Sequence, residues 1–138
     1  GILHTLMAAG YVPVIEPTAF TAFETDELLL EADDVARAIA AATEAVRAIF
    51  FHVAGGVADL ETAALIEELT PAEALAIADD PRVGAALGAA IRAAALGVRA
   101  GVNAAQIVDG RIAHATVIEL LTAQHLGTQV TGSVFTGA

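Results

Sequence analysis

Two groups of residues could carry chemistry because of their type and position. Asp33 and Asp34 stand where a helical pattern begins, and carboxylates there could hold a metal ion or orient a cation. Gly55 and Gly56 end a continuously apolar run of strand type, where residues without side chains could let a phosphate approach the backbone. Each group also has a structural explanation, which we favour: the aspartates cap a helix and interact with its dipole, and the glycines form a plain turn.

Histidines and one arginine supply the remaining candidates. His52, at the end of the apolar run, could be a general acid or base, although a single histidine there is more often a hydrogen-bonded core residue. Arg111 in Asp109-Gly110-Arg111 could bind an anion, although Asp-Gly is also common turn chemistry and the favoured explanation. The other histidines have spacings that fit no zinc template, and they are His4, His114 and His125. The residues alone therefore demonstrate no active site, and they predict no metal site.

The composition excludes several kinds of chemistry and several partners. The 138 residues include no cysteine, which rules out disulfides, thiolate nucleophiles and Cys-ligated zinc. All six basic residues are arginines, so Schiff-base chemistry and lysine-clamped phosphoryl transfer are not open to this chain acting alone. Seventeen acidic residues give a net charge of -11, which disfavours binding to nucleic acid and to anionic membranes.

The hydropathy pattern predicts a folded, cytoplasmic protein. Gly, Asp, Glu and Arg interrupt the apolar stretches before any reaches the roughly 18 to 20 residues of a membrane span. The first ten residues show no signal-peptide pattern. Because the mean hydropathy is +0.69 and charges are few, we expect apolar surface patches and hence possible self-association.

The first third of the chain predicts a helix followed by extended segments. An apolar face in residues 1–9 indicates a helix, which Gly10 ends in a left-handed conformation. Residues 11–17, YVPVIEP, then indicate a short strand closed by a proline. Residues 18–30 could form either a hairpin or an extended flap.

The middle of the chain predicts two helices on either side of a strand. Asp33 or Asp34 should cap a helix over residues 33–48. Residues 48–57, AIFFHVAGGV, are typical of a central parallel strand buried on both faces. Thr70, Pro71 and Glu73 then carry the signature of a capping box at the start of a second helix.

The last third of the chain predicts further helices and strands, which complete a single α/β domain over residues 1–138. An apolar stripe over 83–98 indicates a long helix, which Gly101 would stop and internal glycines could divide in two. The remaining expected elements are a strand over 104–110, a helix over about 114–124 with Val117, Leu120 and Leu121 on one side, and one or two closing strands over 127–135. This alternation predicts a three-layer α-β-α sandwich with a mostly parallel sheet.

Residues 107–130, IVDGRIAHATVIELLTAQHLGTQV, resemble the carboxyl-terminal, nucleotide-binding half of the acetylglutamate kinases, in the amino acid kinase family. In that family the corresponding stretch reads I-I-D-G-R-x-x-H-A, then a helix and G-T. The likeness extends upstream through RAGV (99–102), ELTPAEA (68–74), EADDVARAIAAA (31–42) and AGYVPVIEP (9–17). It covers about half of the family's domain plan, without the amino-terminal glycine-rich phosphate loops and first catalytic lysine.

The resemblance implies phosphoryl transfer from Mg-ATP to the carboxylate of N-acetylglutamate. It assigns Asp33 to catalysis, as the surviving residue of the family's N-x-N-A-D motif, and Gly55, Gly56 and Asp59 to nucleotide binding. The family's Thr or Ser, then Asp, after the central strand is replaced here by His52 and Val53.

The second catalytic lysine of the family is also replaced. By ungapped extension it falls on Ala90, which cannot neutralise charge on a transferring phosphoryl group.

Three hypotheses follow from this pattern of retained fold signals and replaced site residues. The leading one is a catalytically inert, stable α/β domain of engineered, designed or degenerate origin, in which a residual pocket at the strand ends could bind a nucleotide weakly. The second is a fragment or subunit of an acetylglutamate kinase that another chain completes with both lysines. The third is a self-assembling structural module. The residues alone indicate no cofactor, and Mg-ATP is the one that the resemblance implies.

Overall fold

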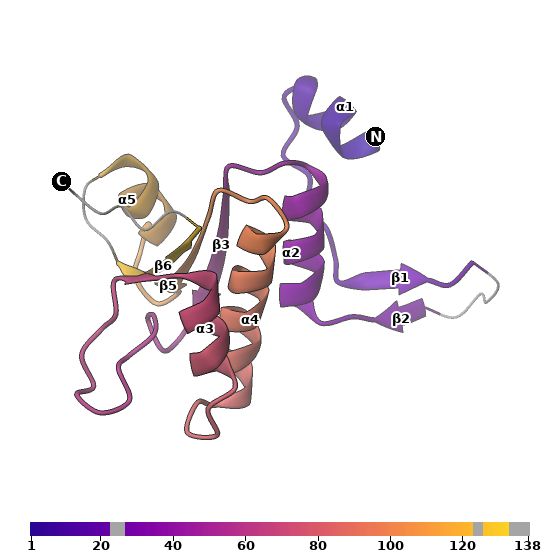
Figure 1. Cartoon of the computed structure of the whole chain (residues 1–138). Helices are drawn as coiled ribbons and strands as arrows, with labels where there is room; N and C mark the ends of the chain where they lie inside the picture. The colour runs from indigo at the N-terminus through magenta and orange to yellow at the C-terminus, as the bar shows by residue number, and fades with distance from the viewer. Residues whose placement is uncertain (23–26, 123–125, 133–138) are drawn as a thin grey trace.

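The computed structural model describes residues 1–22, 27–122 and 126–132, which contain five helices and six strands (Figure 1). No helix in these ranges is long and apolar enough to cross a membrane. The helices are α1 (Ile2–Ala8), α2 (Ala32–Ala42), α3 (Pro71–Ala78), α4 (Ala85–Arg99) and α5 (Ala115–Leu121). The strands are β1 (Thr18–Phe20), β2 (Glu27–Leu29), β3 (Arg47–His52), β4 (Glu68–Leu69), β5 (Ala104–Asp109) and β6 (Gly127–Thr131).

Four of the strands form the main sheet, in the order β3-β5-β6-β4. β3 pairs with β5 and β4 pairs with β6 in parallel, while β5 and β6 are antiparallel. β1 and β2 form a separate antiparallel hairpin that extends away from the sheet (Figure 1). The predicted α/β fold with a mostly parallel sheet is therefore confirmed.

Helices cover both faces of this sheet, as Figure 1 shows. On one face, α4 packs against β3, β5 and β6 and also contacts α2 and α3. Its fully buried Ile91 shares the core with Phe50, Ile107 and Val130 from three strands. On the other face, α5 is joined to β5 by a buried hydrogen bond, in which the amide of Gln106 donates to Glu119 at 2.9 Å. The carboxyl ends of β3 and β5 lie between these layers.

Local sequence signals set several element boundaries as predicted. Thr70 accepts a hydrogen bond from the backbone of Glu73, whose carboxylate accepts one from the Thr70 backbone, so the capping box of α3 is complete. Gly10 and Gly101 follow α1 and α4 with φ of +85° and +114°, which a residue with a side chain adopts only with strain. α4 is one continuous helix, not two.

Residues 11–17 do not form the predicted strand. Within the described ranges no strand lies beside them to complete a ladder, and two of the seven are prolines, which lack an N–H donor. Val12 and Val14 are left 88% and 93% exposed. Residues 18–30 take the hairpin alternative, since β1 pairs with β2 and Leu30 donates a backbone hydrogen bond to Pro17.

The predicted cap of α2 and the predicted burial of β3 are both wrong. Glu31 is the N-cap residue of α2, and Asp33 and Asp34 lie in its first turn, where they face the positive end of the helix dipole without capping it. α2 also ends at Ala42, short of residue 48. β3 is an edge strand of the four-stranded sheet, so only its Phe50 is buried.

The apolar side predicted for the last helix is largely exposed and does not join the core. Val117, Leu120 and Leu121 are 53%, 43% and 79% exposed, whereas Glu119 of the same helix is buried. The side of α5 that carries Glu119 faces inward. The Glu119 carboxylate accepts hydrogen bonds there from the side-chain amide of Gln106 and from the backbone N–H of Leu126. Part of the predicted helix and of the closing strands, residues 123–125 and 133–135, falls outside the described residues. β4, which is only two residues long, was not predicted.

Candidate functional site

The carboxyl ends of β3 and β5 meet at one edge of the sheet, where the sequence places most of its candidate residues. His52 and Asp109 are partners in the parallel register of these strands. The backbone N–H groups of Gly55 and Gly110 both point back to the carbonyl oxygen of His52, at 3.1 and 3.4 Å. Ligands of open α/β folds bind beyond such strand ends, so the two turns define the candidate site.

The two glycines after β3 differ in their surroundings. Gly55 has a φ of +77°, and a Cβ built on it would lie 3.2 Å from Oδ2 of Asp109. Gly56 is buried with a φ of +137°, and a Cβ there would lie 3.1 Å from the hydroxyl of Thr128 and 3.3 Å from Cα of Gly127. Gly56 therefore lets the chain pass close to β6, which is a structural role, while Gly55 faces the candidate site.

Asp33 and His52 are brought together at the same edge. Burial raises the pKa of Asp33 above its usual value, the charge of His52 opposes that rise, and the nearby carboxylates of Asp34 and Glu31 add to it. His52 also accepts a hydrogen bond at Nδ1 from the backbone N–H of Ala54, at 3.0 Å. The imidazole thus has a local structural partner, as its structural explanation requires, and it also lies within electrostatic range of Asp33.

A small cavity lies beside Asp33, between the start of α2 and the side of α4. Its volume is about 150 Å³. The residues that line it are Glu31, Asp33, Asp34, Ala89, Arg92 and Ala93. Arg92 is the cation in this wall, and it is paired with Asp79 at 2.6 Å.

Asp109 and Arg111 form a closed pair on the turn after β5. The guanidinium donates to both carboxylate oxygens, at 2.9 and 2.7 Å, and the backbone N–H of Arg111 donates to Oδ1 at 2.9 Å. These contacts lower the pKa of Asp109 to about 2. Because Nε and Nη2 of the guanidinium already donate to the carboxylate of Asp109, the turn explanation accounts for this stretch without an anion.

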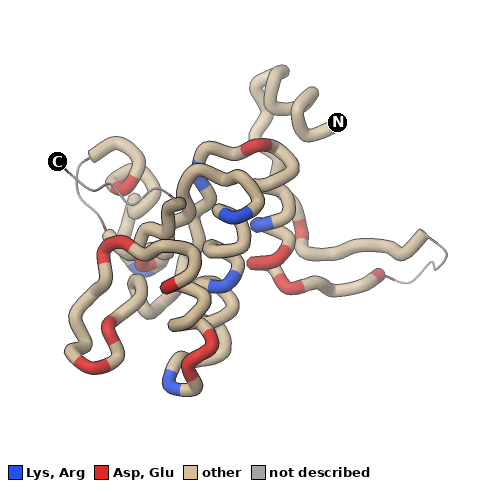
Figure 2. The backbone as a smooth tube through the Cα atoms, in the orientation of Figure 1, with Lys and Arg blue, Asp and Glu red and all other residues tan. Residues whose placement is uncertain are grey.

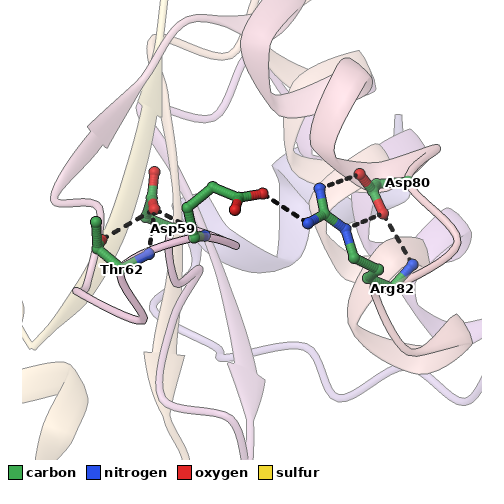
Figure 3. Close-up of polar contacts among 5 residues, drawn as sticks. Asp59, Thr62, Asp80 and Arg82 are labelled. Atoms are coloured by element: carbon green, nitrogen blue, oxygen red, sulfur yellow. Dashed lines mark hydrogen bonds and ion pairs between the residues drawn. The ribbon is translucent and has the colours of Figure 1, made fainter.

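Asp59 organises the loop between β3 and β4. Its Oδ1 accepts three hydrogen bonds, from the backbone N–H groups of Glu61 and Thr62 and from the Thr62 hydroxyl, at 3.0, 2.7 and 2.9 Å (Figure 3). Because hydrogen bonds to the charged form favour it, they lower the pKa of Asp59, the largest cause being the Thr62 backbone. The side chain of Asp59, predicted as a nucleotide ligand, therefore has a structural task in closing this loop.

Arg82 forms an ion pair with the loop between β3 and β4, and the sequence did not predict it. It lies in the turn between α3 and α4, donates to both carboxylate oxygens of Asp80 at 3.1 and 3.0 Å, and reaches Glu61 at 2.7 Å (Figure 3). The Asp80-Pro81-Arg82 stretch signals a turn, but nothing local in the sequence indicates a contact with Glu61, 21 residues away.

The described residues fit Mg-ATP chemistry only in part. Acidic groups are present, but no cluster of three or more metal-ligating side chains occurs among the residues that the structure describes. Both loop arginines, Arg82 and Arg111, are held by carboxylates. Ala90, at the position that resembles the second lysine, is buried in the core. We therefore derive no phosphoryl-transfer step from this site.

Comparison with known proteins shows what this arrangement is similar to. No family model matches the chain. The acetylglutamate kinase of Erythrobacter litoralis is 33% identical over 129 residues, which cover 94% of this chain and 42% of the kinase. The acetylglutamate kinase of Synechococcus sp. strain WH7803 is 38% identical over 133 residues, which cover 95% of this chain and 45% of the kinase. The chain spans less than half the length of these curated relatives.

A solved structure shows the same fold. N-acetylglutamate synthase from Neisseria gonorrhoeae, determined with coenzyme A and N-acetyl-glutamate, superimposes with a TM-score of 0.86 and covers 97% of this chain and 31% of that protein. The two sequences are 21% identical, so this likeness shows the fold alone.

The fold and these relatives define a protein of the amino acid kinase class, and the chain belongs to the amino acid kinase family. Within that family it is homologous to acetylglutamate kinase over part of the kinase's length.

Proposed function

We propose that this chain is the nucleotide-binding half of an acetylglutamate kinase-like protein, and that it is catalytically inert when it acts alone. The inertness is inferred from the basic residues, which are few and, at the candidate site, already paired. The chain has no lysine, and the arginines at the candidate site are bound to carboxylates, namely Arg82, Arg92 and Arg111. Transfer of a phosphoryl group requires positive charge aimed at the transferring oxygens, which this arrangement does not supply.

The charge distribution supports the same proposal. Acidic positions recur on the loops and helix ends of the described backbone, and basic positions are fewer (Figure 2). With a net charge of -11, the chain repels a free nucleotide at long range. Any affinity must therefore come from close contacts at the Gly55 turn or from Mg²⁺ shared with the carboxylates, and we expect weak binding. A stable, degenerate or engineered module with this balance of charges would keep the fold and lose the reaction.

The test is a titration of the purified chain with ADP and with Mg-ATP, with and without N-acetylglutamate, beside an assay for phosphorylated product. The acetylglutamate kinase of Erythrobacter litoralis serves as the positive control. We expect saturable nucleotide binding, a raised melting temperature and no product. Turnover by the chain alone would refute its inertness. If calorimetry shows no heat of binding and the melting temperature does not change at millimolar nucleotide, the proposed nucleotide-binding site is refuted.

A pair of glycine variants tests where the nucleotide binds. Gly55→Ala and Gly10→Ala both place a side chain at a positive φ, of +77° and +85°, so the backbone strain is comparable. Only Gly55 lies at the strand ends beside Asp109. We expect Gly55→Ala to weaken ADP binding and Gly10→Ala to leave it unchanged. Equal affinities for the two variants would place the nucleotide elsewhere.

Self-assembly is a second candidate function, because the chain leaves strand-like surface without partners in the described structure. The outer edge of β3 is unpaired within the four-stranded sheet, and Val12 and Val14 are almost fully exposed. Open edges of this kind promote association between chains. Light scattering after size-exclusion chromatography decides this candidate, since a mass of one chain at all concentrations would count against it.

A further inference from the structure

The loop that carries the candidate nucleotide ligands, residues 53–66, is held at its base by buried contacts. We call it the glycine loop. The backbone N–H of Val57 donates to the hydroxyl of Thr128 at 2.8 Å, and that hydroxyl lies 2.6 Å from the carbonyl oxygen of Ile66. A backbone hydrogen bond of 2.8 Å also joins Ile66 to Val57. The loop is therefore fixed to β6 at Val57 and at Ile66.

The tip of the glycine loop has contacts of a different kind. The Asp59 carboxylate closes the tip on itself through Glu61 and Thr62. One ion pair leaves the tip among those described, from Glu61 to Arg82 in the α3–α4 turn at 2.7 Å. Figure 3 shows the two loops facing each other across this contact.

Asp80 fixes the orientation of the Arg82 guanidinium independently of Glu61. Asp80 accepts from Nε and Nη2 of Arg82 and from its backbone N–H, at 3.1, 3.0 and 2.9 Å. This leaves Nη1 for Glu61. Because the fork is fixed on one side, forming the contact with Glu61 has to order only one more side chain, unlike a typical exposed ion pair between two free side chains.

We propose that Arg82, acting through Glu61, is a positioning residue for the nucleotide site, since it holds the tip of the glycine loop against the α3–α4 turn. This inference rests on the proposed nucleotide-binding function and adds a residue to it that does not touch the nucleotide. Of the candidate nucleotide ligands, Asp59 lies beyond the fixed base at Val57 and Ile66, so a tip that moves freely presents its carboxylate in many arrangements, whereas Gly55 and Gly56 precede that base. Ordering the loop in advance reduces the entropy lost on binding.

The experiment compares Arg82→Lys and Glu61→Gln with the unmodified chain. Lysine keeps the charge but cannot reproduce the fork, and glutamine removes the ion pair. Asp79→Asn is the matched control, because it also neutralises an exposed acid in an arginine pair, with Arg92 at 2.6 Å. Each protein is titrated with ADP, and amide hydrogen exchange is followed at Glu61 and Thr62. Urea unfolding confirms that every variant is folded.

Charge and positioning predict opposite results for Glu61→Gln. The substitution makes the chain less negative, so long-range electrostatics alone would tighten binding of the anionic ADP. Loss of the positioning contact should instead weaken binding by about two- to five-fold, the range of one exposed ion pair. We expect Arg82→Lys and Glu61→Gln to weaken ADP binding and to speed exchange at the loop tip, and Asp79→Asn to do neither.

Three results would overturn the inference. Unchanged exchange in both variants would mean that Arg82 does not hold the loop. Faster exchange with unchanged or tighter ADP binding would mean that the loop is held but not for the nucleotide. An unmodified chain that binds no ADP would refute the proposed function and the nucleotide role together, and the exchange rates would still decide whether Arg82 orders the loop.

Discussion

The substitution Gly56→Ala tests whether the second glycine of the turn after β3 is needed for folding. Gly56 has a φ of +137°, a conformation that costs a residue with a side chain about 1–3 kcal/mol. The added Cβ would also lie 2.7 Å from Cδ1 of Leu65, 3.1 Å from Oγ1 of Thr128 and 3.3 Å from Cα of Gly127. Overpacking of this kind costs about 1–3 kcal/mol more. We therefore expect a total loss of about 2–6 kcal/mol in the free energy of unfolding.

Two comparisons separate strain from crowding. Gly10→Ala meets the strain of a positive φ with no atom within 4 Å, so it should cost only about 1–2 kcal/mol. Leu65 is 47% exposed and its Cδ1 can move, so the double variant Gly56→Ala with Leu65→Ala should recover part of the loss. The contacts with β6 would remain in that double variant.

The measurement is urea unfolding followed by far-ultraviolet circular dichroism, with the slope against urea checked for constancy. A loss for Gly56→Ala no larger than that for Gly10→Ala would refute the reasoning. The close approach of this turn to β6 would then contribute nothing to stability, and Gly56 would have to be explained by ligand binding instead.

Three further predictions concern β6 and the acids of the candidate site. Gly127→Ala should abolish cooperative unfolding, because its Cβ would run into the backbone carbonyl of Ile107 on β5, which circular dichroism during urea unfolding would detect. Asp109→Asn should reduce the fall of the melting temperature between about pH 4 and 2. The Asp109 pKa of about 2 lies below its unfolded value, so Asp109 contributes to stability above about pH 3.9. That contribution is lost as the pH falls, and the variant lacks it at every pH. An acid profile identical to that of the unmodified chain would contradict this. Asp33→Asn should raise the melting temperature at pH 7 and not at pH 3. Burial raises the pKa of Asp33, so the protein loses stability as the pH rises through that pKa and the carboxylate becomes charged. Asparagine stays neutral and avoids this loss. A gain at pH 3 as large as that at pH 7 would point to a cause other than charge.

The boundaries that depend on neighbouring residues were predictable from the sequence. The Thr70–Glu73 capping box is a reciprocal contact over three residues, and the Asp109–Arg111 turn spans two. Gly101 ends α4 because few other residues adopt its φ. In each case the partner stands a few positions away, so the local pattern contains the whole interaction.

Features that depend on distant residues were not predictable. The burial of β3 was misjudged because an apolar run does not reveal how many strands lie beside it. The inward face of α5 could not be predicted locally, because Glu119 is buried with a hydrogen bond to Gln106 on another element. The hydroxyl of Thr128 meets Val57 across 71 residues, and nothing near either residue signals that contact.

The same division explains why the candidate site could be located but not its capacity for chemistry. The strand ends placed Gly55 and Asp109 together, as expected, because parallel strands align their carboxyl ends. What such a site can do depends on its net charge, and that depends on which cations are free. Arg82 and Arg111 count as positive charges in the sequence but are already neutralised by Asp80, Glu61 and Asp109 in the fold. On the proposed function, the positive charge for phosphoryl transfer therefore has to come from another polypeptide segment, and adding ATP or metal to this chain alone should not restore the reaction.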